Sequence, residues 1–222
     1  MLKTESSKLE INNKINEILF ELEKLFPDAR CELNYKNIYE LCVAVMLSAQ
    51  TTDKKVNNIT PTLFSKYPSV KELKNALQQD VELIIRPLGL SNNKSKNIIA
   101  FAKIIDEKYN GAIPNDFETL VTLPGIGRKT ANVVLSEGFG IMRIAVDTHV
   151  ERVSKRLGLS NIDSSVLQVE KDLMDLIPEY NWHKGHHLLL FFGRYFCKSQ
   201  NPNCKECPFI KQCTYRTNRE ID

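Results

Sequence analysis

Apolar residues recur along almost the whole chain at the spacing of one face of an α-helix. In residues 11–26, Ile15, Ile18, Leu22 and Phe26 fall on one such face. Later segments repeat this pattern, and short polar or glycine-containing stretches separate them. The only stretch that reads as a strand is the brief IMRIAV at residues 141–146. The pattern therefore predicts an all-α fold whose helices are joined by short loops.

One predicted helix is apolar on nearly all sides. Residues 37–50 read NIYELCVAVMLSAQ, with a single charged side chain, Glu40. A helix without a polar face is usually buried, so we expect this one to lie at the centre of its domain. It ends in a polar stretch in which Thr52 or Asp53 is suited to cap the next helix.

Composition describes an ordinary globular protein. The chain has 222 residues, of which 42% are apolar and 26% charged, enough for one large domain or two smaller ones. It contains no run of 18 apolar residues and no secretory signal pattern, so we expect no membrane span and a cytoplasmic location. The net charge is +3, and residues 183–222 carry seven Lys or Arg against three Asp or Glu. A basic C-terminal segment could attract a polyanion or could be a solvated tail.

A glycine-containing turn stands out at LPGIGRKTANVV, residues 123–134. Pro124 restricts its own backbone, whereas Gly125 and Gly127 allow positive φ and close approach of another backbone. The N–H groups of Gly125, Ile126 and Gly127, together with the following helix N-terminus, would form a cradle for one phosphate. The sequence predicts a helix–hairpin–helix at about residues 115–136. The alternative is a plain turn between two helices with a glycine cap.

Two residues near this turn are candidates for chemistry. Lys129 lies in the first turn of the predicted helix, where the helix dipole and Arg128 both favour a neutral amine, the form that a Schiff-base nucleophile needs. Asp147 begins another helix 18 residues later (147 − 129). It could support charge separation in a reaction or serve only as an N-cap, and the two roles are compatible. The sequence leaves two roles open for Arg128: it contacts phosphate, or it is a neighbour whose charge influences Lys129.

Four of the six cysteines lie in the last 26 residues. Cys197, Cys204, Cys207 and Cys213 have the spacing C-x6-C-x2-C-x5-C, which suits one closed metal site. Without export, thiols or metal ligands are expected rather than disulfides. Zinc and a four-iron–four-sulfur (4Fe–4S) cluster both fit four cysteines, so the residues alone leave the metal open.

Taken together, these motifs resemble the endonuclease III family of DNA glycosylases. The resemblance rests on LSAQTTD at residues 47–53, on LPGIGRKTANVVL, on VDTHVERV and on the cysteine spacing, and it runs in order from about residue 10 to 215. It implies two helical domains. A six-helix barrel would occupy residues 31–141, and residues 1–30 and 142–222 would form a discontinuous domain with the 4Fe–4S cluster.

The resemblance also implies roles for individual residues. Lys129 matches the Schiff-base lysine of the family, and Asp147 matches its catalytic aspartate on the other side of an interdomain cleft. Gln50 matches the residue that fills the gap left by a flipped base. Leu90 lies in the loop that wedges the opposite strand. The four tail cysteines match the ligands of a 4Fe–4S cluster, which decides between iron and zinc.

The function implied is a bifunctional DNA glycosylase/AP lyase, acting as a monomer on oxidised, ring-saturated pyrimidines in duplex DNA. A saturated pyrimidine is non-planar and should stack poorly, which lowers the cost of flipping it. Two other hypotheses remain. An adenine-specific mismatch glycosylase would generally lack a residue like Lys129, and in a non-catalytic DNA-binding module Lys129 would only contact phosphate.

Overall fold

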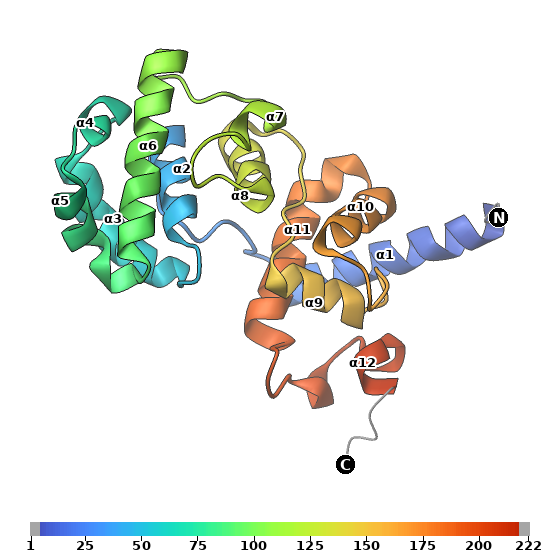
Figure 1. Cartoon of the computed structure of the whole chain (residues 1–222). Helices are drawn as coiled ribbons and strands as arrows, with labels where there is room; N and C mark the ends of the chain where they lie inside the picture. Colours follow the sequence, from blue (N-terminus) through green and yellow to red (C-terminus); the bar gives the residue numbers. More distant parts are fainter. Residues whose placement is uncertain (1–4, 218–222) are drawn as a thin grey trace. The chain divides into compact units, whose positions relative to one another are not determined.

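The structure, a computed structural model, describes residues 5–217, with side chains from residue 14 to residue 216. Every element in this part of the chain is helical, and no strand occurs in it. The all-α prediction is therefore confirmed, and the strand considered at residues 141–146 is wrong, since these residues form neither helix nor strand. The chain divides into two compact units (Figure 1): unit one comprises the residues up to Cys31 and those from Met142 onward, and unit two comprises Glu32–Ile141.

Unit two is organised around the apolar helix α2. All residues of α2 from Tyr39 to Leu47 are buried, because α2 packs against α3, α6, α8 and η2. The central position expected for this helix is confirmed. The helices of unit two are α2 (Ile38–Leu47), α3 (Asp53–Lys66), α4 (Val70–Lys74), α5 (Gln78–Ile85), η1 (Arg86–Leu88), α6 (Ser91–Tyr109), α7 (Phe117–Leu120), α8 (Arg128–Val133) and the π-helical turn η2 (Val134–Gly138).

Side-chain caps set where several of these helices begin. Asn37 accepts a hydrogen bond from the backbone N–H of Glu40 at the start of α2. Thr52 caps α3 in the same way, as one of the two predicted alternatives. Asp116 caps α7 by accepting from Thr119 N at 2.8 Å. Each cap satisfies a backbone donor that the first turn of a helix leaves unpaired.

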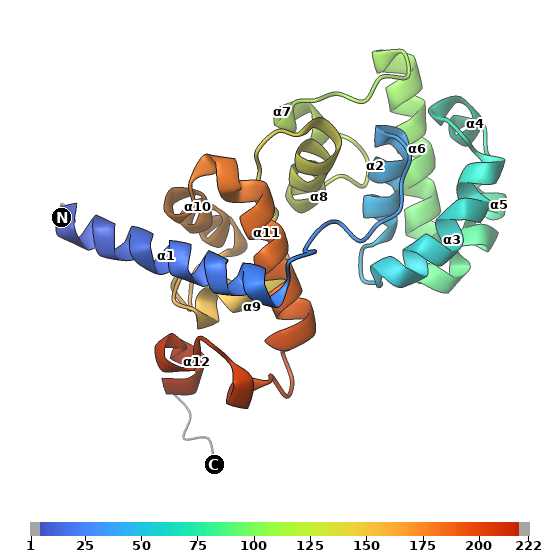
Figure 2. The ribbon, with the colours of Figure 1, turned by 180° about the vertical axis from the view of Figure 1, so that it is seen from behind.

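Unit one joins the two ends of the chain. Helix α1 packs against α10 and α11, and α9 packs against α10, α11 and α12 (Figure 2). The helices of unit one are α1 (Glu5–Leu25), α9 (Thr148–Arg156), α10 (Val166–Leu176), η3 (Glu179–Asn181), α11 (Trp182–Phe191), the π-helical turn η4 (Phe192–Phe196), η5 (Cys204–Glu206), η6 (Ile210–Gln212) and α12 (Thr214–Thr217).

The core of unit one draws on residues far apart in sequence. Ile15, Ile18 and Leu22 of α1 lie in the same buried cluster as Val150 of α9 and Phe192 of η4. The apolar stripe of the N-terminal helix is thus what holds it to the C-terminal half of the chain. Between residues 5 and 217, no helix has the length and apolarity needed to cross a membrane.

Candidate active site

The glycine turn lies between α7 and α8 in unit two. The N–H of Ile126 donates to the carbonyl of Leu123 at 3.1 Å, and the N–H of Ala131 donates to the carbonyl of Gly127 at 2.9 Å. Gly127 is thus the N-cap of α8, and as a glycine it has no side chain to cap the helix. A ligand that accepts hydrogen bonds could take the place of such a cap at this helix start.

The two glycines of the turn serve different purposes. Gly125 has φ +76°, and a Cβ there would lie 2.5 Å from Met46 Cε and 3.0 Å from Asn97 Cβ. Gly125 therefore has the expected positive φ, but the atoms that approach it closely belong to side chains and not to another backbone. Gly127 has φ −93° and ψ 179°, an extended conformation open to any residue, so this position does not use the positive φ that a glycine allows. Among the described residues, no non-neighbouring atom lies within 4 Å of a Cβ placed on Gly127, so the space beside this Cα is open.

We expect Gly125→Ala to lower the free energy of unfolding by about 2 kcal/mol. An alanine at this positive φ would strain the backbone, and its Cβ would force the side chains of Met46 and Asn97 to move. Gly127→Ala is the matched control and should stay within about 0.5 kcal/mol of wild type. Urea unfolding of both variants measures the difference. Equal stability of the two would contradict the distinction between the glycines.

The residues after the turn differ sharply in exposure. Ile126 is 4% exposed, so only its backbone can reach a ligand. The Arg128 guanidinium lies 4.8 Å from the ring centroid of Phe117, a cation–π contact that links α8 to α7. The sequence did not reveal this role for Arg128. Lys129 is exposed in the first turn of α8, as its position after Gly127 predicts.

Two further predicted site residues share an uncommon backbone. Gln50 has φ +56° and Leu90 has φ +52°, and both side chains are exposed. Left-handed conformations are unfavourable for residues other than glycine and occur often at functional sites. Leu90 is 54% exposed although it is a large apolar residue, and it directly precedes α6. Each residue thus projects from a tight turn of unit two.

Lys94 supports the Leu90 turn and was not recognised in the sequence. It is 6% exposed, its Nζ donates to the carbonyl of Leu88 at 3.1 Å, and its N–H donates to the carbonyl of Leu90 at 3.0 Å. Burial lowers the pKa of Lys94. A signal was present, because Lys94 falls on the apolar face of α6, four residues before Ile98.

Asp147 is the N-cap of α9 in unit one. Its Oδ1 accepts from the N–H groups of His149 and Val150, both at 2.9 Å. The predicted capping role is therefore confirmed, and the carboxylate remains partly exposed. One oxygen makes both cap bonds, and no cap bond is formed by Oδ2.

Helix α9 is seated closely on η4. A Cβ on Gly193 would lie 2.9 Å from His149 Cβ and 3.0 Å from the His149 carbonyl, so only glycine fits there. The Arg152 guanidinium donates to the Gly193 carbonyl at 2.7 Å and to the Cys197 carbonyl at 3.2 Å. These bonds fix the helix that carries Asp147 to the start of the cysteine segment.

The four tail cysteines line one small apolar cavity. Phe192, Phe196 and Ile210 contribute to the same lining. Cys213 is buried, whereas Cys197, Cys204 and Cys207 are half-buried. No disulfide joins any of the six cysteines, all of which lie in the described part of the chain.

These thiols lie close enough to affect one another. Burial, with a further contribution from Cys197, Cys213 and Cys204, raises the pKa of Cys207 to about 11. Four thiolates could therefore share this cavity only with a cation to balance them. Cys42 differs, because burial on α2 raises the pKa of its thiol to about 12 without any contribution from another cysteine. Such a thiol behaves as an inert part of the core.

Comparison with known proteins places the chain in a family. The sequence profile of the HhH-GPD superfamily base excision DNA repair proteins matches residues 43–179. Endonuclease III of Bacillus subtilis is 51% identical over 202 residues, which cover 90% of this chain and 92% of that protein. The chain belongs to the endonuclease III family. The matched profile includes Gln50, Leu90, Lys129 and Asp147 but ends before Cys197.

Solved structures of endonuclease III agree with this placement. A trapped endonuclease III–DNA covalent intermediate matches with a TM-score of 0.91 and 47% identity, covering 100% of both chains. A non-covalent endonuclease III–DNA complex matches with a TM-score of 0.90 and 47% identity, covering 98% of both chains. The resemblance seen in the motifs is therefore confirmed over the whole length of the chain.

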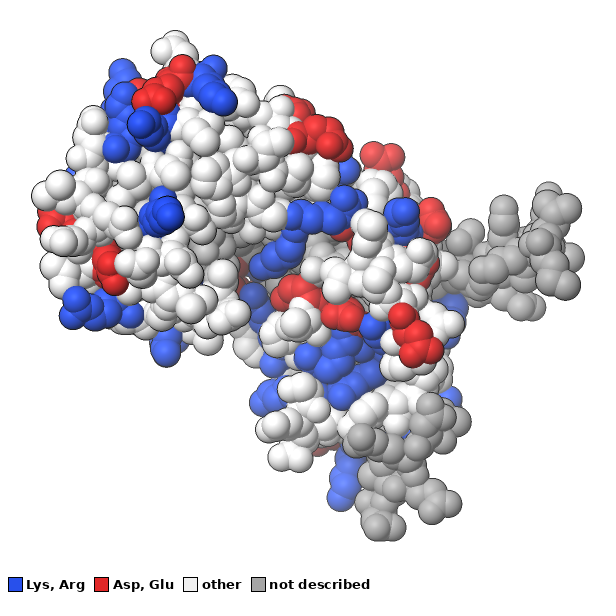
Figure 3. All heavy atoms as spheres, viewed as in Figure 1, with Lys and Arg blue, Asp and Glu red and all other residues white. Residues whose placement is uncertain are grey.

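In this endonuclease III family member, basic side chains gather near the C-terminal end of α9. Figure 3 shows Lys and Arg atoms together on this face of unit one. Arg152, Lys155 and Arg156 line a cavity of about 540 Å³, together with Thr214 and Tyr215. Lys155 is paired with Glu151 at 2.7 Å, so the excess charge comes mainly from the two arginines.

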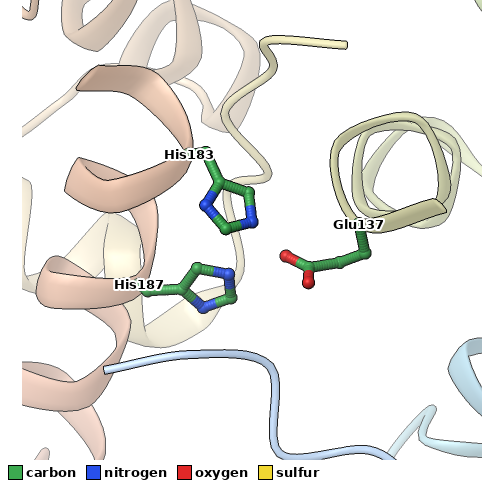
Figure 4. A group of neighbouring side chains, drawn as sticks. All are labelled: Glu137, His183 and His187. Atoms are coloured by element: carbon green, nitrogen blue, oxygen red, sulfur yellow. The ribbon is translucent and has the colours of Figure 1, made fainter. Parts of the chain in front are cut away.

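A group of histidines lies on α11. Figure 4 shows His183 and His187 on successive turns, with Glu137 of unit two labelled in the same view. The ring centroids of His183 and His187 are 4.7 Å apart, and those of His186 and His187 are 4.9 Å apart. Two imidazoles from one helix do not complete a tetrahedral metal site, so we assign these rings to packing within unit one.

Proposed function

We propose that Lys129 is the nucleophile and Asp147 the assisting carboxylate of the reaction. As a member of the endonuclease III family, the chain is a DNA glycosylase with AP lyase activity in base excision repair. One observation carries the assignment of the nucleophile. Lys129 is exposed and is the second residue of α8, and the space beside Gly127, the N-cap of this helix, is open. A phosphate at the helix start would bring the sugar backbone to this amine.

The proposed chemistry has two stages. The Lys129 amine attacks C1′ of the sugar while the bond from C1′ to the base breaks, and the base leaves with that electron pair and takes up a proton. Asp147 stabilises the positive charge that develops on the sugar and accepts the proton lost by the amine. The sugar ring then opens to give an iminium between Lys129 and C1′.

Strand cleavage follows from the iminium. It makes a C2′ proton acidic, and loss of this proton expels the 3′ oxygen as C2′ and C3′ form a double bond. Water then hydrolyses the imine and releases Lys129. One lysine thus accounts for base removal and for β-elimination.

We assign DNA contacts to exposed turns of unit two. The backbone of Gly125, Ile126 and Gly127, with Arg128 beside it, would bind phosphate at the start of α8. Gln50 and Leu90 both project from turns with a left-handed backbone. Gln50 would occupy the space left by the flipped nucleotide, and Leu90 would wedge the opposite strand. The substrates are ring-saturated pyrimidines, whose poor stacking lowers the cost of flipping. The enzyme would act as a monomer on cytoplasmic, nucleoid DNA.

We further propose that the two compact units are the two domains expected for the family. Unit two would be the six-helix barrel, and unit one would be the domain that holds the cofactor. The predicted ranges also include residues 1–4 and 218–222, which lie outside the described residues.

We infer that the cysteine cavity holds a 4Fe–4S cluster. All four tail cysteines line this one cavity, together with Phe192, Phe196 and Ile210. Four thiolates could hold either one zinc ion or one cluster with a thiolate on each iron, and membership of the endonuclease III family favours the cluster. The cluster would cross-link this segment and add a one-electron redox centre.

A panel of labelled duplexes tests the proposed function. One carries a ring-saturated pyrimidine, one an AP site and one an adenine mismatch. We expect excision and strand cleavage on the first, cleavage on the second and no excision on the third. Adenine excision without strand cleavage would favour the mismatch glycosylase, and binding without any product would favour the non-catalytic module.

Replacing Asp147 by asparagine separates its two roles. Asparagine caps helices about as well as aspartate, so we expect the free energy of unfolding to stay within about 0.5 kcal/mol of wild type. Loss of the carboxylate charge should lower single-turnover base excision by at least about 100-fold. Asp116→Asn, which keeps the cap of α7, serves as the control and should leave excision unchanged. Full excision by Asp147→Asn would leave Asp147 as a cap only.

The wedge assignment is tested with two exposed leucines of unit two. Leu90 is 54% exposed and Leu83 is 57% exposed, so truncating either should change stability little. We expect Leu90→Ala to lower excision about tenfold, because the flipped state loses about 1.4 kcal/mol of support. Leu83→Ala should retain wild-type excision. Equal rates for the two variants would remove Leu90 from the DNA contacts.

A further inference from the structure

One buried arginine of α9 makes a direct contact with a tail cysteine. Arg156 is the last residue of α9 and is 7% exposed. Its Nη1 donates to the Sγ of Cys197 at 3.2 Å and to the carbonyl of Lys198 at 2.9 Å. The contact joins two residues 41 positions apart in the sequence.

The guanidinium is held in place from the other end of the cysteine segment. It lies 3.9 Å from the ring centroid of Tyr215. Thr214 Oγ1 donates to the carbonyls of Lys155 and Arg156 at 3.1 and 3.2 Å. Since Thr214 follows Cys213, the end of α9 is connected to both the first and the last cysteine of the motif.

The surroundings of Arg156 lack a matching carboxylate. Its contacts are a sulfur, a carbonyl and an aromatic ring, and no carboxylate lines the adjacent cavity among the residues described. Burying a cation without opposite charge is costly. A thiol at Cys197 would leave that charge unmatched, whereas a metal-bound thiolate would supply a negative partner at hydrogen-bond distance.

We propose that Arg156 is a positioning residue for the 4Fe–4S cluster, which orients the Cys197 thiolate and raises the reduction potential of the cluster. This inference rests on the proposed cofactor. A hydrogen bond to a ligand sulfur and a nearby positive charge both stabilise the more reduced, more negative state of the cluster. Arg156 would therefore serve the cluster and would not contact DNA.

The test uses the full-length holoprotein and its variants. Iron content of the wild type is measured first, then the midpoint potential by voltammetry and the rate of iron loss to a chelator. Arg156→Met removes the hydrogen-bond donor to Cys197 and the positive charge. Arg156→Lys keeps the charge but lacks the planar guanidinium with its several N–H donors. Lys155→Met is the matched control, because it removes one charge from the adjacent residue, whose amine is paired with Glu151.

We expect Arg156→Met to shift the potential to a more negative value and to lose iron several-fold faster than Lys155→Met. Arg156→Lys should lie between Arg156→Met and wild type. If circular dichroism shows that Arg156→Met is unfolded, the shift in midpoint potential of Arg156→Lys decides the test. Wild-type protein without iron would contradict the proposed cofactor. A loaded wild type with unchanged potentials in the Arg156 variants would overturn this inference alone.

Discussion

Lys129→Ala is expected to lower single-turnover base excision and strand cleavage by at least about 1,000-fold. The exposed amine at the start of α8 is the proposed nucleophile, and alanine supplies none. The fold should be unaffected, because alanine is a better helix former than lysine and the position is exposed. Both activities should fall together, since one covalent intermediate leads to both products.

Lys129→Arg is the matched control for electrostatics. Arginine retains the positive charge and a phosphate contact but stays protonated and forms no Schiff base. We expect this variant to bind damaged duplex with affinity close to wild type and to be as inactive as Lys129→Ala. Strand cleavage at the wild-type rate by either variant would contradict the assignment.

Cys213→Ala is expected to abolish iron binding and to lower the free energy of unfolding by at least about 3 kcal/mol. Cys213 is the buried cysteine of the motif, and the proposed cluster would cross-link the cysteine segment much as a disulfide or structural metal does. Iron analysis and urea unfolding measure the two effects. Because α9 carries both Asp147 and Arg156, part of the activity should be lost as well.

Cys31→Ala provides the control for this loss. Cys31 is half-buried but lies outside the motif, so iron content should stay at the wild-type value. Iron retained by Cys213→Ala at the wild-type level would exclude Cys213 as a ligand. Zinc in place of iron in the wild type would contradict the choice of cofactor.

The local patterns that could be predicted from the sequence are those with short-range causes. The all-round apolarity of residues 38–47 predicted that α2 is buried, and Asp147 could be recognised as an N-cap. The four cysteines pointed to one site because their types and spacing restrict the chemistry. The helix pattern and the N-cap involve residues within a few positions of one another. Four closely spaced cysteines are informative because thiols in such a cluster usually bind a metal.

The features that could not be predicted depend on neighbours distant in sequence. Gly125 requires glycine because Met46 and Asn97 lie against it, whereas Gly127 has an extended backbone and no such neighbour. Arg128 contacts Phe117 on another helix. Arg156 reaches Cys197 only after α9 and the tail have packed. Nothing in the spacing of these residues indicates which contact forms.

Borohydride trapping tests the role of Lys129 most directly. Borohydride reduces an iminium to a stable amine, so the wild-type enzyme incubated with a duplex containing one ring-saturated pyrimidine should form a covalent adduct. We expect peptide mapping to place the DNA on Lys129 and expect Lys129→Ala to form no adduct. An adduct on another residue, or none from wild-type enzyme that cleaves the strand, would contradict Lys129 as the nucleophile.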